Sequence, residues 1–281
     1  FDIVTNSPNV GENLTINITL PDDAKGNVTV RINEENYTAN ITNGTVYFEI
    51  PNLAYGKYDF TAYYVGDDKY HDSHRTSEAF VTKVYPYQFD VTPVDIYVGE
   101  NETIKIVLPN DVNGNVTITI DNTEYTNNIV NVVNGTGWFN VTGLKEGVYS
   151  LSVSLKNDIK YRDNAVASRF KVSPIEDYLF EVTVSNPNYV RDNITFTVEL
   201  PTNASGNVSV ILFGNEYQGT VENGVAVVNI TAPYYGTFSY SVSFEEKGKY
   251  TLKTQTGSVV ISKLNVDLNP EFKSPVQVNE N

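Results

Sequence analysis

One short phrase occurs three times along this chain at nearly constant spacing. Leu20-Pro21 leads through a turn to Gly26-Asn27-Val28, and close copies of this phrase follow Leu108-Pro109 and Leu200-Pro201. The copies lie 88 residues (20 to 108) and 92 residues (108 to 200) apart, which is the size of one small domain. The spacing predicts domains at 1–84, 85–173 and 174–263, and it makes 264–281 the first strand or linker of a truncated fourth repeat.

Apolar and polar side chains alternate in every copy. Residues 14–19 read Leu-Thr-Ile-Asn-Ile-Thr, which is typical of a strand with one buried face. The same period predicts a long strand whose inward residues are Tyr58, Phe60, Ala62 and Tyr64; Tyr149, Leu151, Val153 and Leu155; and Phe238, Tyr240, Val242 and Phe244. The dipeptides Asn43-Gly44, Asn134-Gly135 and Asn223-Gly224 predict hairpins.

About seven such strands per copy, with no helical periodicity, predict the fold class. We expect an all-β protein of three tandem immunoglobulin-like β-sandwich domains in an extended arrangement. Pro86 and Pro174 are predicted to occupy equivalent places in the two junctions, so the linkers should be short and stiff.

Two segments predict a tyrosine corner, in which a tyrosine hydroxyl donates to the preceding loop. They are Leu-Ala-Tyr-Gly-Lys-Tyr, which ends at Tyr58, and Leu-Lys-Glu-Gly-Val-Tyr, which ends at Tyr149. The third copy has Phe238 at this place. Phenylalanine has no hydroxyl, so a looser corner is expected there.

Composition excludes several classes of function. The net charge of −15 argues against binding to nucleic acid or to an anionic membrane surface, because both require clustered Lys and Arg. The chain has no Cys, and hence no disulfide or thiolate site. The sequence contains no run of 18 apolar residues, so it predicts no membrane-spanning helix. Because Phe1 is not preceded by a methionine or leader, we expect a segment of a longer, processed protein.

Several of these phrases together resemble a known family. They are Gly11-Glu12-Asn13-Leu14-Thr15, the Leu-Pro to Gly-Asn-Val-Thr turn, Asn-Gly, Leu-x-x-Gly-x-Tyr and Gly66-Asp67-Asp68-Lys69-Tyr70. The set is similar to the Ig-like repeats (bacterial Ig-like group 3 type) of adhesin-like surface proteins from gut methanogenic archaea. The third copy departs from the pattern, with Arg191-Asp192-Asn193 in place of Gly-Glu-Asn. The resemblance implies repeats that act as spacers in a stalk.

Asn-x-Ser/Thr sequons are frequent, and they predict N-glycosylation of a secreted surface protein. A chain rich in Asn and Thr also makes sequons by chance, so we expect a subset to be occupied. The candidates are Asn13, Asn17, Asn27, Asn36, Asn40, Asn43, Asn101, Asn115, Asn134, Asn140, Asn193, Asn203, Asn207 and Asn229.

One loop gathers acidic and imidazole side chains, which are ordinary metal ligands. It contains Asp67, Asp68, His71, Asp72 and His74. The corresponding loops at 156–160 and 245–249 lack such a cluster, and no EF-hand spacing is present. We therefore favour a solvated polar loop and expect no metal and no cofactor.

Catalysis has no support in the sequence, because no nucleophile turn or phosphate loop is present. We expect that the protein is not an enzyme. An internal Lys–Asn isopeptide bond needs a lysine that points into the core. Lys105 and Lys171 alternate with apolar neighbours and should face water, so no such crosslink is expected.

The favoured function is a stalk in an extracellular, cell-surface adhesin-like protein, which projects a binding region for cell–cell or cell–host adhesion. Its expected partner is a protein or glycan on another cell, and the chain itself is expected to be monomeric. The alternative is that one module is itself a glycan- or protein-binding domain. Tyr63, Tyr85, Tyr87 and Tyr97 could form such a patch, although packing at sheet edges and junctions is the favoured interpretation.

Overall fold

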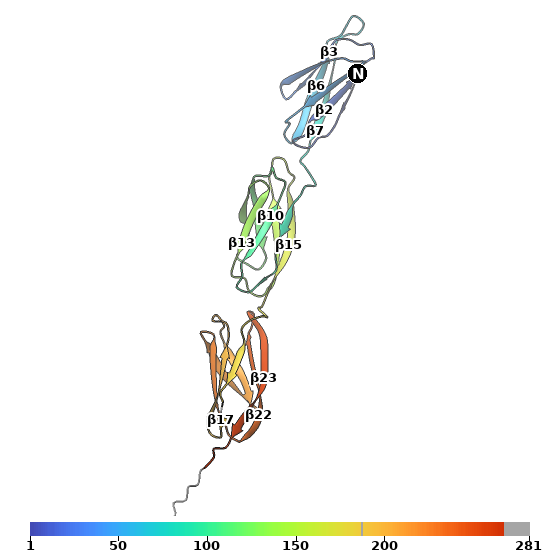
Figure 1. The fold of residues 1–281 in the computed structure, drawn as a ribbon. Coiled ribbons are helices and arrows are strands. Elements are labelled where there is room, and N and C mark those ends of the chain that lie inside the picture. The colour runs from blue at the N-terminus through green and yellow to red at the C-terminus, as the bar shows by residue number, and fades with distance from the viewer. Residues whose placement is uncertain (187, 267–281) are drawn as a thin grey trace, which may run out of the picture. The chain divides into compact units, whose positions relative to one another are not determined.

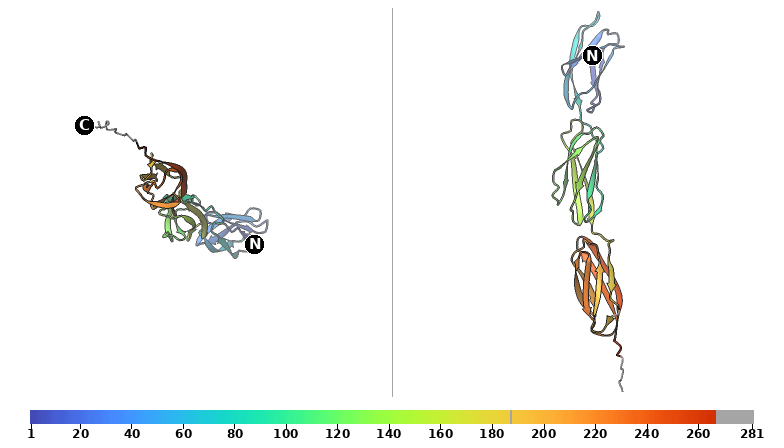
Figure 2. Two further views of the ribbon diagram at one scale, coloured as in Figure 1. Left: turned by 90° about the horizontal axis from the view of Figure 1, so that it is seen from below. Right: turned by 60° about the vertical axis from the view of Figure 1, so that its left-hand side comes forward.

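A computed structural model describes residues 1–186 and 188–266 of the chain. This part is all-β: it consists of strands and connecting turns and contains no helix, and thus none that could cross a membrane (Figures 1 and 2). Most of the predicted fourth repeat, residues 267–281, lies outside the described residues.

The first repeat is built from two antiparallel sheets. One sheet has the strand order β1 (Asp2–Thr5), β2 (Leu14–Thr19), β5 (Thr45–Ile50). The other has the order β4 (Glu35–Asn40), β3 (Asn27–Ile32), β6 (Gly56–Tyr64), β7 (Ser73–Val81). A parallel bridge from Asn9 to Thr82 carries the chain from the first sheet to the edge of the second. Three strands facing four, with this crossing, form an immunoglobulin-like sandwich.

The second repeat has the same topology. Its smaller sheet has the order β13 (Thr136–Val141), β10 (Glu102–Val107), β8 (Asp90–Thr92). Its larger sheet has the order β12 (Asn128–Val132), β11 (Gly114–Ile120), β14 (Gly147–Leu155), β15 (Asn164–Ser173), β9 (Ile96–Tyr97). Here the crossing is a short strand, β9, which pairs in parallel with β15.

The third repeat joins its two sheets into one. The strand order is β16 (Glu181–Val184), β18 (Asn193–Glu199), β21 (Val225–Thr231), β20 (Asn215–Glu222), β19 (Asn207–Leu212), β22 (Gly236–Glu246), β23 (Tyr250–Ser262), β17 (Asn188–Tyr189). Strand β20 pairs with β19 as far as Thr220 and then with β21 from Val221. Gly219 sits at this change of partner, where a Cβ would lie 2.6 Å from Val228 Cγ2. The missing side chain lets the strand turn the corner.

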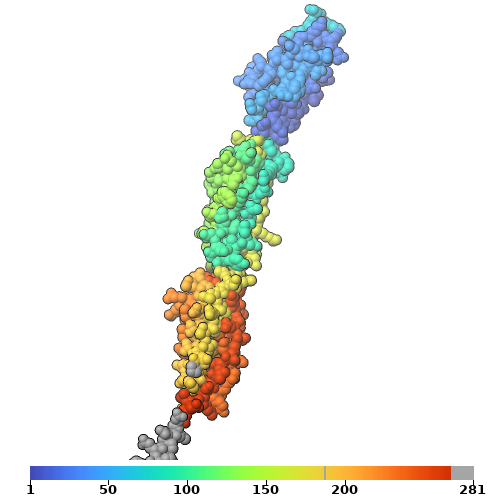
Figure 3. Space-filling model, viewed as in Figure 1, coloured from blue at the N-terminus to red at the C-terminus, as the bar shows by residue number. Residues whose placement is uncertain are grey.

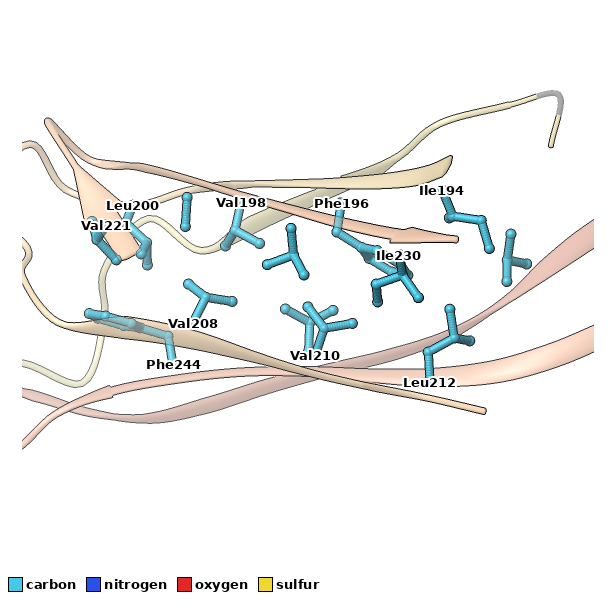
Figure 4. Close-up of a cluster of buried hydrophobic side chains, with 14 of the residues drawn as sticks. Ile194, Phe196, Val198, Leu200, Val208, Val210, Leu212, Val221, Ile230 and Phe244 are labelled. Carbon is cyan, nitrogen blue, oxygen red and sulfur yellow. The ribbon is translucent and has the colours of Figure 1, made fainter. Parts of the chain in front are cut away.

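The predicted inward residues line these sandwiches. Phe60, Ala62 and Tyr64 are buried on β6, whereas Tyr58 at the start of the strand is partly exposed. The alternation therefore predicted the buried face correctly, and it did so in all three copies of the long strand. Figure 4 shows the result in the third repeat, where side chains of β18 point toward those of β19.

The recurring Asn-Gly dipeptides form the turns of the predicted hairpins. Asn134 and Gly135 have φ values of 48° and 74°, the left-handed conformation of a hairpin turn. The carbonyl of Gly135 accepts the amide of Leu108 at 2.7 Å, and Gly44 and Gly224 accept Leu20 and Leu200 at the same distance. The Asn-Gly and Leu-Pro phrases recur together because each turn is hydrogen-bonded to the other.

The segments that enter the second and third repeats correct one prediction. Val84 forms a parallel bridge with Tyr161, and Ile175 forms the same bridge with Tyr250. Pro86 follows its bridge residue by two positions, whereas Pro174 precedes its own by one. The two prolines are therefore not equivalent, and Val84 corresponds to Ile175. The domain boundaries stay predictions; the last strands of the repeats end at Val81, Ser173 and Ser262.

Candidate functional site

A cluster of three polar side chains ties two loops together in the second repeat. Lys160 Nζ lies 2.6 Å from Asp111 Oδ2, and the hydroxyl of Tyr161 donates to Asp111 Oδ1 at 2.6 Å. Asp111 belongs to the turn after Leu108-Pro109, and the lysine and tyrosine belong to the loop between β14 and β15. We call this arrangement the clasp.

The charges of the clasp support one another. The hydrogen bonds from Lys160 and Tyr161 lower the pKa of Asp111. The same carboxylate raises the pKa of Lys160, while burial, followed by the bond to Asp111, raises the pKa of Tyr161. Near neutral pH the clasp therefore holds a carboxylate, an ammonium group and a neutral phenol, which is its bonded state.

The first repeat contains the same clasp. The hydroxyl of Tyr70 donates to Asp23 Oδ1 at 2.7 Å, and Lys69 Nζ pairs with Asp23 Oδ2. Hydrogen bonds from Lys69 and then Tyr70 lower the pKa of Asp23. More than half of the lysine and aspartate side-chain surface is exposed, so the ion pair itself adds little stability.

The third repeat replaces the aspartate by an amide. The hydroxyl of Tyr250 donates to Asn203 Oδ1 at 2.6 Å, and Lys249 Nζ donates to the main-chain carbonyl of Asn203. The tyrosine bond of the clasp is thus kept with a neutral acceptor, while the lysine bonds the main chain of this residue and not its side chain. Asn203 also heads one of the sequons, so this side chain already has a structural role.

The acidic loop that contains the metal candidates is ordered by hydrogen bonds to its main chain. Asp67 accepts main-chain amides from Lys25 at 2.7 Å, Lys69 at 2.8 Å and Tyr70 at 2.7 Å, which lowers its pKa. His74 lies on β7, stacked on Tyr63. The described residues contain no group of three or more His, Asp and Glu side chains placed to hold a metal. Asp67 orders the loop through these bonds. In the second repeat Asp158 does the same, because its carboxylate accepts hydrogen bonds from the main-chain amides of Lys160 and Tyr161.

One of the two predicted tyrosine corners is confirmed. The hydroxyl of Tyr58 donates to the carbonyl of Ala54 at 2.9 Å. Tyr149 stacks on Phe170 at 5.6 Å between ring centroids, and its corner bond stays a prediction. In the third repeat the ring of Phe238 packs edge-on against that of Phe213, with 4.8 Å between the ring centroids. This residue makes an aromatic contact and has no hydroxyl for a corner bond.

The sequon asparagines lie on the surface of the repeats. All are exposed except Asn27, which is partly exposed. In the third repeat two sequons face each other across β18 and β21. Thr195 donates to Asn229 at 2.8 Å, and Thr231 donates to Asn193 at 3.0 Å. Position on the surface satisfies the first requirement for attachment of a glycan.

The remaining candidates fall on separate elements. Lys105 and Lys171 are exposed, as predicted, so neither reaches into the core. Tyr63 and Tyr97 lie on β6 and β9, whereas Tyr85 and Tyr87 meet edge-on at 6.4 Å. Tyr85 and Tyr87 are therefore in ring contact with each other. Figure 3 draws the side chains of the three repeats as spheres, and no buried side-chain nitrogen or oxygen of the described residues lacks a partner.

The clasp was missed from sequence, although a signal was present. A Lys-Tyr pair stands at 69–70, 160–161 and 249–250, and an Asp or Asn stands three residues after each recurring Leu. These two features recur in all three copies. Their recurrence together could have suggested a contact.

Comparisons with known proteins add little. A scan of protein-family models and a search of curated proteins found no match. Latent PorU from Porphyromonas gingivalis aligns with 94% of this chain at 14% identity with a TM-score of 0.26, and this chain spans 32% of its length. The titin I-band fragment I67–I69 aligns over 94% of this chain and 97% of its own, at 15% identity and a TM-score of 0.34. The fibronectin(III)-like modules of Clostridium thermocellum CbhA align over 61% and 94%, at 14% identity and a TM-score of 0.26. At these TM-scores the fold assignment rests on strand pairing and not on the alignments.

Proposed function

We propose that this chain is a stalk segment of an extracellular, cell-surface adhesin-like protein and has no catalytic role. The single observation that supports this most is the clasp, whose tyrosine bond recurs between the corresponding loops of all three repeats. Its lysine, tyrosine and acid or amide are bonded to one another and hold loops. Because the recurring polar residues bond to one another and connect loops, they favour a mechanical role for the chain over a catalytic one.

The surface of the repeats supports an extracellular setting. Sequons recur on both sheets of the first repeat, at Asn17 on β2 and at Asn36 and Asn40 on β4. Glycans at a subset of these positions would cover the repeat and protect it from proteases. The phrases quoted above link the chain with the Ig-like repeats (bacterial Ig-like group 3 type) of adhesin-like proteins from gut methanogenic archaea. In this proposal the partner of the whole protein is a protein or glycan of another cell, and the stalk is a monomer.

Small-angle scattering of the 281-residue chain tests the stalk. If each repeat contributes about ten residues of strand at ~3.3 Å each, a rod of three repeats has a maximum dimension on the order of 100 Å. A dimension typical of a compact globule of this mass would refute the proposal. Glycopeptide mass spectrometry of the protein from its source tests the surface assignment, which predicts a mass increase at one or more sequons.

One observation favours the alternative, a binding role for the third repeat. Tyr234 and Tyr235 are 65% and 61% exposed, and Lys263 lies 4.0 Å above the ring of Tyr235. Together with Pro233 and Val190 they line a shallow depression. Exposed aromatic rings beside a cation suit a sugar or a peptide. A glycan array probed with the chain and with a Tyr234→Ala, Tyr235→Ala variant tests this role, which requires a signal that the variant loses.

A further inference from the structure

Three Asn-Gly turns occupy the same place in the three repeats, and their asparagines are chemically alike. Asn43, Asn134 and Asn223 are exposed, while the glycine that follows each of them is buried. Two of the turns are identical in sequence, because Asn-Gly-Thr stands at 43–45 and at 134–136. A difference in reactivity between these two turns therefore reflects the structure around them and not the tripeptide itself.

The turn of the second repeat is held by two hydrogen bonds to the loop before β11. The amide of Gly135 donates to the carbonyl of Val112 at 2.9 Å. The amide of Asn134 donates to Oδ1 of Asn113, also at 2.9 Å. Asn113 precedes a glycine too, but it lies outside the hairpin turn, and its Nδ2 donates to the carbonyl of Asp111 at 3.3 Å. Both main-chain amides of the Asn134-Gly135 dipeptide are thus fixed.

The turns of the first and third repeats lack these bonds. In the described part of the chain, the main-chain amides of their Asn-Gly dipeptides have no hydrogen-bond partner. The sequence explains part of this, because the place of Asn113 is taken by Lys25 in the first repeat and by Ser205 in the third. A lysine ammonium group accepts no hydrogen bond. The hydroxyl of Ser205 already donates to the carboxylate of Glu246 at 2.9 Å.

An asparagine followed by glycine loses ammonia without an enzyme when its main chain is free to move. The glycine amide nitrogen attacks Cγ of the asparagine, the Cγ–Nδ2 bond breaks, and the amide proton leaves with the ammonia. Water then opens the succinimide ring at one of its two carbonyls and gives aspartate or isoaspartate. A tight turn has to open before the nitrogen reaches Cγ, so the rate follows the fraction of molecules in which the turn is open. Each hydrogen bond to the two amides lowers that fraction.

We propose that Asn43 and Asn223 are sites of spontaneous deamidation and that the bonds to the neighbouring loop protect Asn134. Isoaspartate adds one methylene group to the main chain of the turn. The glycine carbonyls of the two reactive turns accept the amides of Leu20 and Leu200 at 2.7 Å, so the modified turn should loosen the end of the repeat that the clasp closes. The first and third repeats therefore age before the second.

Deamidation competes with glycosylation at one of the two sites. Asn43 heads a sequon, so a glycan on its Nδ2 blocks the loss of ammonia. Asn223 is followed by Gly224 and Val225 and heads no sequon. The reactivity of Asn223 is therefore the same with or without glycans, and it does not depend on the extracellular assignment.

Ageing of the folded 281-residue chain, produced without glycans, tests these sites. Peptide mass spectrometry measures aspartate and isoaspartate at each of the three positions over time. We expect Asn43 and Asn223 to react about tenfold faster than Asn134, because two hydrogen bonds hold the second turn closed. In urea, which unfolds all repeats, Asn43 and Asn134 should react at equal rates. Equal rates at Asn43 and Asn134 in the folded chain, or a difference that persists in urea, would overturn the proposal.

A pair of variants at Asn113 tests the cause of the protection. Asn113→Lys copies the first repeat and removes the acceptor of the Asn134 amide, so Asn134 should react about fivefold faster. Asn113→Asp keeps a side-chain oxygen at this place and should leave Asn134 as slow as before. Asn43 lies in another repeat and serves as the unchanged reference for both variants. If Asn134 reacts at the same rate in the two variants, the loop does not protect it and the proposal fails.

Discussion

The hydroxyl of Tyr161 donates to Oδ1 of Asp111 across 2.6 Å and so joins two loops that lie 50 residues apart in the sequence. The bond recurs from Tyr70 and from Tyr250 in the other repeats. Each repeat is therefore closed at the end where its Leu-Pro and Asn-Gly turns meet.

The chain also contains one tryptophan, Trp138 on β13, so Trp fluorescence in the full chain follows unfolding of the second repeat alone.

Removal of the clasp hydroxyl should weaken the second repeat. In a Tyr161→Phe variant the ring stays and the bond to Asp111 is lost, and we expect the free energy of unfolding to fall by about 1 kcal/mol. Urea denaturation followed by Trp138 fluorescence measures this change. Tyr97→Phe is the matched control, because Tyr97 is half exposed on the same repeat and should give no change. Equal midpoints for the two variants would contradict a structural role for the clasp.

The clasp should also loosen in acid. Asp111 has a lowered pKa in the folded chain, so its stabilising effect is fully present above the pKa of an unfolded aspartate, about 3.9, and is lost as the pH falls through the folded value. The amide of Val112, which donates to Pro109 at 3.0 Å beside Asp111, reports this change through its NMR chemical shift. An Asp111→Asn variant should lose the step below pH 4. A step that persists in the variant belongs to another group.

Glycine at the Asn-Gly turn should be indispensable. A Cβ on Gly135 would lie 2.5 Å from the carbonyl oxygens of Leu108 and Pro109 at a φ of 74°, so Gly135→Ala should cost about 3 kcal/mol. Gly143 has a φ of 70° and open space around its Cβ position, so Gly143→Ala should cost about 1 kcal/mol for conformation alone. Trp138 fluorescence in urea compares the two variants. Equal losses would show that the contact between the turns does not matter.

The corner of the third repeat should be looser than that of the first. Tyr58 holds Ala54 through its hydroxyl, and Phe238 has no such group. Hydrogen exchange of residues 54–58 should therefore be slower than that of residues 234–238, and Tyr58→Phe should bring the two closer together. Equal protection of both corners in the unmodified chain would mean that the ring contact between Phe238 and Phe213 replaces the bond.

Local rules predicted most of the fold, because the signals are local. The alternation of apolar and polar residues predicted the buried face of β6. The dipeptide Asn134-Gly135 predicted a hairpin turn in the second repeat, because such a turn needs residues with positive φ. Gly219 was not foreseen, since its role depends on β20 changing partners between two sheets, which is a property of the packed structure.

The candidate site was harder to predict, because it depends on distant pairs. Asp67 was grouped with the nearby histidines by closeness in sequence, yet its carboxylate turns back to main-chain amides, one of which is 42 residues away. The two junctions were misaligned by matching Pro86 with Pro174, because proline is prominent in a sequence and the bridge residues Val84 and Ile175 are not. The correct alignment of the two segments follows from their bridge partners, Tyr161 and Tyr250.

The order along the chain of the segments that enter the second and third repeats also matters for how such a chain is made. Val84 and Tyr87 precede every strand of the repeat that they close, and Ile175 and Tyr178 do the same for theirs. A ribosome releases the amino-terminal end first, so the closing piece is already outside when the loop that it covers emerges. Each sandwich can then finish folding before the next one is translated, which limits pairing between unfinished, similar neighbours.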